Sequence, residues 1–346
     1  MSRPADLPAH PAPDPAILPS VEAVRAAAER VAPHVPRSGL VEAPAELSER
    51  VGVPVWFKME LENPTGSFKV RGAFNALATL PPEEQARGVV CSSAGNHGLG
   101  VAYAARALGI PATVYVPVTA PDVKKAGIRA LGATVNDEAA DYDVAMVVAK
   151  AHAAREGIRF INPCLGLPLL AGQGTVALEL LAQLPSMGSV VICTGGGGLL
   201  GGMGAVLRAL APAVRIIGAQ SVETAAMTRS LAAGRVVEVP VTPTLADGLS
   251  GQIDDDALHI GQVCADRMAL VTEEQLGETI AWLHRATGLV VEGAGAVTVA
   301  ALRHGLVAAP PGPVVALVSG RNIDPARLET LVARFAPAGL PPIGRE

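Results

Sequence analysis

Short apolar runs alternate with amphipathic segments from Gly88 onward. The apolar runs have the length and the β-branched content of strands, and the segments between them repeat apolar residues at helical spacing. The expected strands are GVVCSS, ATVYVP, GATVND and IRFIN, and the expected helices cover residues 96–108, 121–131 and 142–155. Strands that alternate with helices of about 10–15 residues predict βαβ units around a parallel sheet.

The same alternation returns in the second half of the chain. The runs SVVICT, VRIIGAQS and PVVALVSG are expected strands, and residues 175–184 and 199–210 are expected helices, as are residues 21–32 near the start. We therefore expect an α/β protein with a small domain at residues 88–163 and a large domain formed by residues 21–87 and 164–346. A proline-rich arm, residues 1–20, precedes both.

The composition fits two domains and narrows the functional classes. The chain has 346 residues, whereas one domain usually has about 100–200. Half of the residues are hydrophobic but only 3% are aromatic, so the core has to be built from aliphatic side chains. A net charge of -5 without any block of Lys and Arg argues against a nucleic-acid partner. No apolar run reaches the ~18 residues that span a membrane, and the start lacks a secretory signal, so we expect a cytoplasmic protein without a membrane partner.

The cysteines and histidines show no pattern of a metal site. Cys91, Cys164, Cys193 and Cys264 lie far apart and form no CxxC pair. Three of them lie in apolar runs, so each is expected to be a buried, reduced thiol. The seven histidines form no ligand spacing such as HExxH, and we expect no metal site.

The run VVICTGGGGLLGG joins an expected strand to an expected helix through Gly195, Gly196, Gly197 and Gly198. Without side chains, several backbone N–H groups can converge on an anion, and the helix N-terminus adds about half a positive charge. A merely flexible turn would cost backbone entropy without a return. The motif therefore predicts a phosphate-binding turn.

The same run also satisfies GxGxxG, through Gly196, Gly198 and Gly201, so a dinucleotide site has to be considered. That site requires an acidic residue about 20 positions further on, at the end of the next strand. The sequence has Gln220 there, and Glu223 lies beyond it. Four consecutive glycines suit one compact phosphate better than an extended dinucleotide.

The stretch SSAGNHGLG, residues 92–100, lies at another strand-to-helix junction. Small hydroxyl residues and free N–H groups at a helix start can hold a carboxylate. Asn96 is equally expected as a simple helix cap, and His97 by itself is more typical of a structural residue. The turns PTLADGLSG, VEGAGA and VSGRNID also follow apolar segments, and together they predict the rim of one site.

The stretch ENPTGSFKVRGA places Lys69 among small and turn-forming residues. By itself Lys69 is either a solvated cation or an amine held for covalent chemistry. Pyridoxal phosphate is the cofactor that needs both a phosphate-binding turn and a lysine amine, with which it forms a Schiff base.

Five motifs in this order, TGSFKVRGA, SSAGNHG, GGGGL, ADG and SGRN, resemble the serine/threonine dehydratase family. The resemblance covers residues 31–324. It implies fold type II of the pyridoxal-phosphate enzymes, the tryptophan synthase β-like fold, with two domains that each have a mainly parallel sheet flanked by helices. It also implies a homodimer.

The resemblance implies a role for each matching residue. Lys69 would carry the Schiff base, and Phe68 and Gly248 would lie against the two faces of the pyridine ring. Ser319 would bond the pyridine nitrogen and Asn96 the 3-hydroxyl. The phosphate would be held by Gly195, Gly196, Gly197, Gly198 and Leu199. The substrate carboxylate would be bound by Ser93, Ala94, Gly95, Asn96 and His97.

The implied reaction is the dehydration and deamination of a β-hydroxy amino acid such as L-threonine or L-serine to a 2-oxo acid and ammonia. Lys69, once released from the cofactor, would act as general base at Cα. A serine at the ring nitrogen, unlike a carboxylate, would not stabilise a protonated pyridinium, which favours loss of the β-substituent over transamination.

Several positions depart from the family pattern. Related serine racemases have a serine where this chain has Ala94, so we expect weak racemisation. Their divalent-metal ligands align with Ala219 and Ala225, although a shifted register would bring in Glu223. Many dehydratases carry two aspartates where this chain has Leu165 and Gly166, which leaves a threonine preference open. The chain ends soon after the last motif, so we expect no appended regulatory module and no feedback inhibition.

Arg321 occupies the variable position of the SGRN motif. An arginine at the rim of the site can pair with a second substrate carboxylate, or it can be an ordinary surface residue that pairs with a nearby acid. The first alternative favours a 3-hydroxyaspartate dehydratase. An enzyme of hydroxyectoine catabolism, a serine racemase, a non-catalytic pyridoxal-phosphate-binding protein and a nicotinamide oxidoreductase are further alternatives.

Overall fold

The computed structural model describes residues 10–240, 242–307 and 311–336, and these form two β-sheets. The larger sheet has six strands in the order β1-β2-β10-β7-β8-β9, and its neighbours are parallel except at the β1–β2 edge. Its strands are β1 (Leu40–Glu42), β2 (Val55–Lys58), β7 (Ser189–Cys193), β8 (Arg215–Ser221), β9 (Arg267–Val271) and β10 (Val314–Leu317). The pattern of the sequence predicted β7, β8 and β10 but not β1, β2 or β9.

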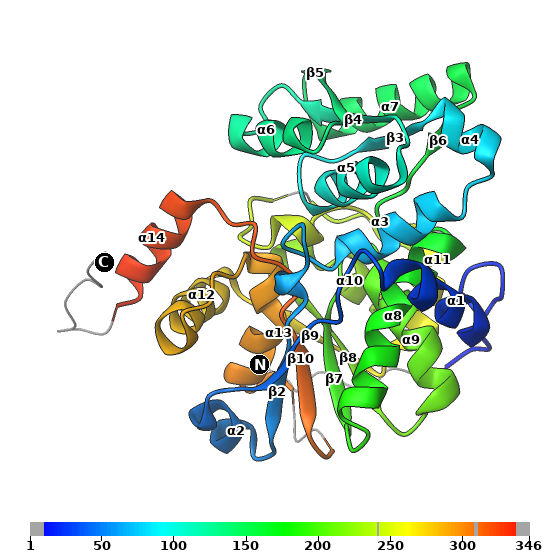
Figure 1. Ribbon diagram of the computed structural model, residues 1–346. Helices are drawn as coiled ribbons and strands as arrows, with labels where there is room; N and C mark the ends of the chain where they lie inside the picture. The colour runs from blue at the N-terminus through cyan, green and yellow to red at the C-terminus, as the bar shows by residue number, and fades with distance from the viewer. Residues whose placement is uncertain (1–9, 241, 308–310, 337–346) are drawn as a thin grey trace.

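The smaller sheet has four parallel strands in the order β5-β4-β3-β6. They are β3 (Val89–Ser92), β4 (Ala112–Pro117), β5 (Thr134–Ala139) and β6 (Arg159–Phe160), which confirms the four strands expected in this region. Helices α5 (Asn96–Leu108) and α6 (Asp122–Ala130) cover one face, and α7 (Tyr142–Glu156) covers the other (Figure 1). Domain boundaries at residues 88 and 163 stay a prediction.

The larger sheet is also covered on both faces (Figure 1). One side carries α13 (Gly293–Arg303), with α12 (Glu273–Thr287) and α2 (Ala45–Val51) packed against it and α14 (Pro325–Arg334) packed on α12. The other side carries α8 (Leu167–Gln183), α9 (Gly198–Leu210), α1 (Val21–Val31), α10 (Ala226–Ala233) and α11 (Asp255–Cys264). Helix α3 (Lys69–Ala78) packs on both α5 and α8, so it joins the two sheets, and α4 (Pro82–Arg87) leads into β3.

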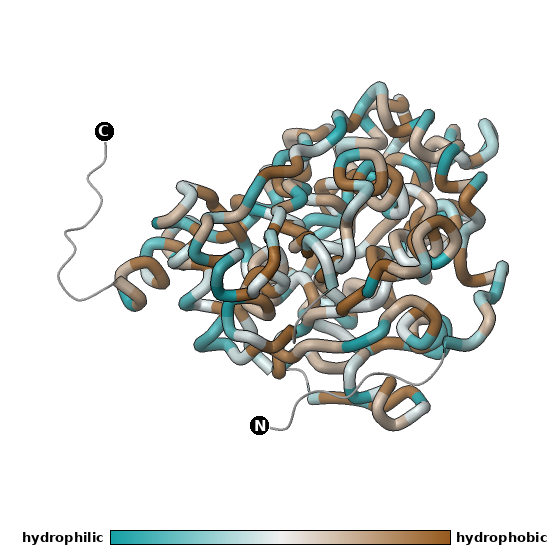
Figure 2. Tube along the Cα trace, turned by 90° about the horizontal axis from the view of Figure 1, so that it is seen from below, coloured by the Kyte–Doolittle hydropathy of each residue, from teal (hydrophilic) through white to brown (hydrophobic). Residues whose placement is uncertain are grey.

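Burial on both faces explains the aliphatic composition. Every residue of β3, β7 and β10 is buried, as expected for parallel strands that lie between two layers of helices. Along the helices at the surface, hydrophobic and hydrophilic positions alternate (Figure 2). None of the described helices is both long and apolar enough to cross a bilayer.

Three expectations about local structure need correction. Helix α8 begins at Leu167, not at residue 175, and contains Gly172, where a Cβ would lie 2.5 Å from Arg71 O. Glycines such as this one weaken the helical signal but let the helix approach α3 closely. The VEGAGA turn is already the start of α13, at Gly293. Cys164 is only half-buried, whereas the other three free cysteines are buried.

The described part of the arm docks on the end of α11. His10 Nε2 pairs with Asp266 Oδ1 at 2.9 Å, and its Nδ1 contacts Gln262 O at 2.9 Å. Residues 1–9 of the predicted arm lie outside the described residues.

Candidate active site

Lys69 is the first residue of α3, and its position is set by the segment that leads into the helix. Phe68 N donates to Ser319 O at 3.1 Å, and Ser67 forms a bridge with Gly320. These contacts fix the start of α3 beside the carboxyl end of β10. The Lys69 amine does not point to solvent, because Nζ donates to Pro163 O at 2.8 Å. It also lies 5.3 Å from the centroid of the Phe68 ring.

The glycine turn lies between β7 and α9. Gly197 has a φ of 87°, in the left-handed region that favours glycine, and Gly198 begins the helix. The first amide with an intrahelical acceptor is Gly201 N, which donates to Gly197 O at 2.7 Å. By helix geometry the amides of Gly198 and Leu199 therefore have no intrahelical acceptor. They are available to an anion.

The glycine turn and the Lys69 amine share one wall of the site. A Cβ at Gly196 would lie 2.7 Å from Cys164 Sγ, and one at Gly198 would lie 2.7 Å from Cys164 O. Cys164 directly follows Pro163, the acceptor of the Lys69 amine. The structure therefore brings the predicted lysine and the predicted glycine turn together.

Asn96 begins α5 and is held from both ends of its amide. Its Nδ2 donates to Glu292 Oε1 at 2.6 Å, and its Oδ1 accepts from Asn322 Nδ2 at 2.6 Å. A Cβ at Gly320 would collide with Glu292 Oε1, so this position requires glycine. These contacts place Asn96 beside the loop that follows β10.

Glu292 is a buried acid that the sequence reasoning did not single out. It is the N-cap of α13, but its side chain makes no capping hydrogen bond. Burial raises its pKa to about 7, although the hydrogen bond from Asn96 acts in the opposite direction. The acid lies in the VEGAGA segment, where only its glycines gave a signal.

Ser319 is almost fully buried at the carboxyl end of β10, and its hydroxyl donates to Ala294 O at 3.2 Å. The neighbouring Cys193 is neutral, because burial raises the pKa of its thiol to about 11. The group at this position is therefore a neutral hydroxyl, not a carboxylate, and the thiol beside it is also neutral.

The predicted carboxylate-binding segment forms the β3–α5 turn. Ser93, Ala94, Gly95 and Asn96 are half-buried, and Gly95 N donates to Ser93 Oγ at 3.2 Å. His97 differs, because it is buried and its Nε2 donates to Ile161 O at 3.0 Å. Burial lowers the pKa of His97 to about 3, so the ring is neutral and ties the turn to the chain after β6.

Gly248 lies in the 3-10 turn Asp247–Leu249, which crosses two parts of the site. A Cβ at Gly248 would lie 3.1 Å from Ala294 Cβ, and one at Gly195 would lie 3.1 Å from Leu249 Cα. This turn therefore packs on both α13 and the glycine turn, and the place of Gly248 against the cofactor ring stays a prediction.

Arg321 lies on the outer side of the segment that leads to Lys69. Its N donates to Gly66 O at 2.9 Å, and its exposed side chain packs over Gly66. It lines a cleft of about 390 Å³ together with Arg106 and Leu99, and Lys69 is not among the lining residues. The geometry leaves its role as a reader of substrate a prediction.

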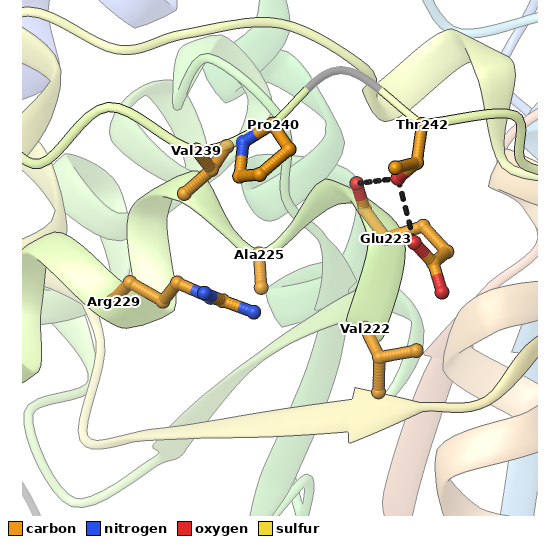
Figure 3. A pocket seen from close by; sticks show the side chains of 7 residues that line it. All are labelled: Val222, Glu223, Ala225, Arg229, Val239, Pro240 and Thr242. Carbon is orange, nitrogen blue, oxygen red and sulfur yellow. Dashed lines mark hydrogen bonds between the residues drawn. The ribbon is translucent and has the colours of Figure 1, made fainter.

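A second cavity, of about 70 Å³, lies at the end of β8 (Figure 3). The Glu223 carboxylate accepts from Thr242 Oγ1 at 2.6 Å, and the Arg229 guanidinium points toward the cavity (Figure 3). Ala225 contributes only a methyl group. A cavity lined by a single carboxylate and a guanidinium disfavours a divalent cation. Among the described residues no group of three or more His, Cys, Asp or Glu side chains is placed to hold a metal ion.

The position that a dinucleotide site needs is occupied by a fully buried amide. Gln220 Nε2 donates to Thr224 O at 2.7 Å, and its Oε1 accepts from Thr228 N at 2.9 Å. Because both ends of the amide are engaged inside the protein, this residue is not placed to bind a ribose. The dinucleotide site suggested by GxGxxG therefore lacks the acidic residue that it requires at the end of the next strand.

The chain is similar to known enzymes over most of its length. The family model described as "Pyridoxal-phosphate dependent enzyme" matches residues 31–320. An L-threonine ammonia-lyase of Geobacter sulfurreducens is 38% identical over 90% of this chain and 77% of its own length. An L-threonine ammonia-lyase of Thermotoga maritima is 41% identical over 83% of this chain and 71% of its own length.

Solved structures show the same fold. The processed form of threonine deaminase isoform 2 from Solanum lycopersicum superposes with a TM-score of 0.85 at 29% identity, over 96% of this chain and 92% of its own. A maize serine racemase superposes with a TM-score of 0.86 at 30% identity, over 92% of this chain and 98% of its own.

The residues present fit the cofactor of that family. An amine and a turn without side chains share one wall, and a Cβ at Gly196 or Gly198 would fill the space against Cys164. Since the family model covers more than half of the chain and the geometry agrees with it, the chain belongs to the pyridoxal-phosphate-dependent enzymes, has fold type II and is a lyase.

Proposed function

We propose that the chain is an ammonia-lyase that converts a β-hydroxy amino acid, such as L-threonine or L-serine, to a 2-oxo acid and ammonia. The observation that carries the proposal is the shared wall of Lys69 and the glycine turn, where Lys69 Nζ bonds Pro163 O and Cys164 packs on Gly196. The similarity to L-threonine ammonia-lyases over most of the chain supports the substrate class.

Different residues of the site would hold different parts of the cofactor. The free amides of Gly198 and Leu199 would hold its phosphate at the start of α9. Lys69 would bond its aldehyde carbon, and Phe68 and Gly248 would lie against its ring. Ser319 would bond the ring nitrogen and Asn96 the 3-oxygen. When bound, the cofactor supplies an electron sink for the charge that develops at the substrate Cα.

The other residues act on the substrate. The half-buried β3–α5 turn would bind the substrate carboxylate at the start of α5 through Ser93, Gly95 and Asn96. The Lys69 amine would take the Cα proton, and the β-hydroxyl would leave as water after it gains a proton. One water then returns and ammonia leaves, so the products are a 2-oxo acid and ammonia. Ala94 offers no second proton carrier, which favours elimination over racemisation.

A panel of L-threonine, L-serine and 3-hydroxyaspartate, with detection of the 2-oxo acid, tests the proposal. We expect turnover of at least one β-hydroxy amino acid by the wild type and none by Lys69→Ala. Bound pyridoxal phosphate without any 2-oxo acid from the panel would point to the non-catalytic alternative. Stronger turnover of 3-hydroxyaspartate than of threonine or serine would favour the diacid alternative.

We also propose that the protein is a homodimer and that it is cytoplasmic. The family resemblance supports a homodimer, which light scattering in solution tests directly. The four free cysteines favour a location in the cytoplasm, where thiols are kept reduced. Fractionation of cells that produce the protein tests the compartment.

A further inference from the structure

The amide of Asn96 is held in one orientation. A side-chain amide has two hydrogens on nitrogen and an oxygen that only accepts. Asn96 Nδ2 gives one hydrogen to Glu292 Oε1 at 2.6 Å, and its Oδ1 faces the donor Nδ2 of Asn322 at 2.6 Å. A flipped amide would lose both bonds. One hydrogen on Nδ2 remains free for another acceptor.

Glu292 is itself fixed by backbone contacts. Its N donates to Gly320 O at 3.1 Å, and its own carbonyl accepts from Gly295 N and Ala296 N at 2.9 Å. There is no room for a Cβ at Gly320 beside the carboxyl group. The acid therefore presents its Oε1 to Asn96 from a rigid position at the start of α13.

We propose that Glu292 is a positioning residue, which acts with Asn322 to aim the remaining amide hydrogen of Asn96 at the 3-oxygen of the bound cofactor. This inference rests on the proposed function, because it assumes that Asn96 contacts the cofactor. Asn96 belongs to the helix that follows β3, whereas Glu292 is the N-cap of α13, which packs on the larger sheet, and Asn322 follows β10 of that sheet. The three residues therefore also tie the two sheets together across the site.

The strength of this tie depends on the charge of Glu292. Burial raises its pKa to about 7, so the carboxyl changes charge near neutral pH. The charged groups that face it are Asp247 on the 3-10 turn and Lys124 on α6, and the buried Cys193 on β7 is neutral. The amine of Lys69 is also near Cys193. When Glu292 is ionised, its bond from Asn96 becomes charge-assisted and stronger.

The affinity for pyridoxal phosphate reports on the contact between Glu292 and Asn96 and does not depend on catalytic activity. We expect Glu292→Ala to weaken the binding of pyridoxal phosphate about tenfold, the effect of one lost hydrogen bond at the upper end of its usual range. In the wild type, affinity should rise as Glu292 ionises between roughly pH 6 and 8. Glu292→Gln keeps an acceptor but does not titrate, so this rise should disappear. Comparison of these two proteins also separates the rise from titration of the cofactor itself.

A double-mutant cycle distinguishes positioning from general destabilisation. Because Glu292 acts through Asn96, the variant that combines Asn96→Ala with Glu292→Ala should bind the cofactor no more weakly than Asn96→Ala alone. The matched control is Glu278→Gln, an acid on α12 that pairs with Arg303 and should leave cofactor affinity unchanged. Additive losses in the cycle, or an unchanged pH dependence in Glu292→Gln, would overturn the inference.

The absorbance of the wild type distinguishes a failure of the proposed function from a failure of the role of Glu292. A wild-type protein that binds pyridoxal phosphate without the visible absorbance of a lysine-linked cofactor would contradict the proposed function. A wild type with that absorbance but an additive cycle would contradict only the role of Glu292.

Discussion

The amine of Lys69 donates a hydrogen bond to the backbone oxygen of Pro163 at 2.8 Å. Lys69 begins a helix that joins the two sheets, and Pro163 lies in the turn after the last strand of the smaller sheet. The next residue, Cys164, packs on the glycine turn at the start of α9. This single contact places an amine and an anion-binding turn from distant parts of the chain on one wall.

The first prediction concerns the space between Gly196 and Cys164. In Gly196→Ala the new Cβ would lie 2.7 Å from Cys164 Sγ, closer than side chains tolerate, so the turn has to shift. We expect the affinity for pyridoxal phosphate to fall by about tenfold or more, since the amides no longer converge on the phosphate. Equilibrium dialysis of the cofactor measures this.

Two further variants control the Gly196 experiment. Gly127→Ala on α6 meets nothing closer than Leu99 Cδ2 at 3.4 Å and should leave cofactor affinity unchanged. Adding Cys164→Gly to Gly196→Ala should restore part of the affinity. Full affinity in Gly196→Ala alone would mean that the turn does not hold the phosphate.

The second prediction concerns a buried ion network on α3. Arg71 Nε donates to Glu60 Oε2 at 2.7 Å, and its Nη1 donates to Glu179 Oε1 at 2.7 Å. Burial alone would raise the pKa of Glu60, but Arg71 reverses this and holds the pKa below its usual range. Arg71→Met leaves the buried Glu60 without its guanidinium partner, whereas Glu179 keeps Lys58 Nζ at 2.6 Å. We expect it to lower the free energy of unfolding by about 3–5 kcal/mol in urea denaturation.

A second substitution tests whether the unpaired charge of Glu60 causes the loss of stability. Replacing Glu60 by Gln in the Arg71→Met background removes the unpaired charge and should recover much of the lost stability. If Arg71→Met is as stable as the wild type, the network does not anchor α3.

The order of strands and helices was largely readable from the sequence, because parallel strands buried on both faces leave continuous apolar runs. β7, β8 and β10 are such runs, and the glycines mark the turn after β7. β2 was missed because a short strand that contains Lys58 breaks the apolar pattern. Lys58 is nevertheless buried, and its Nζ donates to Glu179 at 2.6 Å.

The site was only partly readable, because motifs name residues but not their partners. Lys69, the glycine turn and Asn96 each follow a strand or begin a helix, which local sequence reveals. Glu292 is 196 residues from Asn96, and no local pattern announces a contact over that distance. Pro163 contributes a backbone oxygen, which any residue carries.

The third prediction follows from the pKa of Glu292. Its pKa rises from an ordinary value of 4.5 to about 7 in the folded protein, so folding favours the protonated acid. This stabilisation is complete below pH 4.5 and is lost as the pH rises through 7. The loss amounts to at most about 3 kcal/mol, at about 1.36 kcal/mol per pKa unit.

Denaturation of the cofactor-free protein measures this effect. Between roughly pH 5 and 8, the wild type should lose stability relative to Glu292→Gln, which cannot ionise. A constant difference between the two proteins across that range would show that Glu292 does not titrate there.

The fourth prediction concerns Arg321, which lines a cleft with Arg106. If the guanidinium pairs with a second carboxylate of the substrate, Arg321→Ala should lower kcat/KM for 3-hydroxyaspartate at least about tenfold more than for serine. Arg106→Ala is the matched control from the same cleft. Equal losses on both substrates would remove Arg321 as a reader of diacids.

The most direct test of the central claim is to find the residue that is linked to the cofactor. Borohydride reduction of the protein with bound pyridoxal phosphate, followed by peptide mass spectrometry, should place the pyridoxyl-phosphate mass on Lys69. Lys69→Arg, which keeps the charge, should carry no such label. A label on any other lysine, or an unlabelled Lys69 in protein that holds the cofactor, would contradict the account.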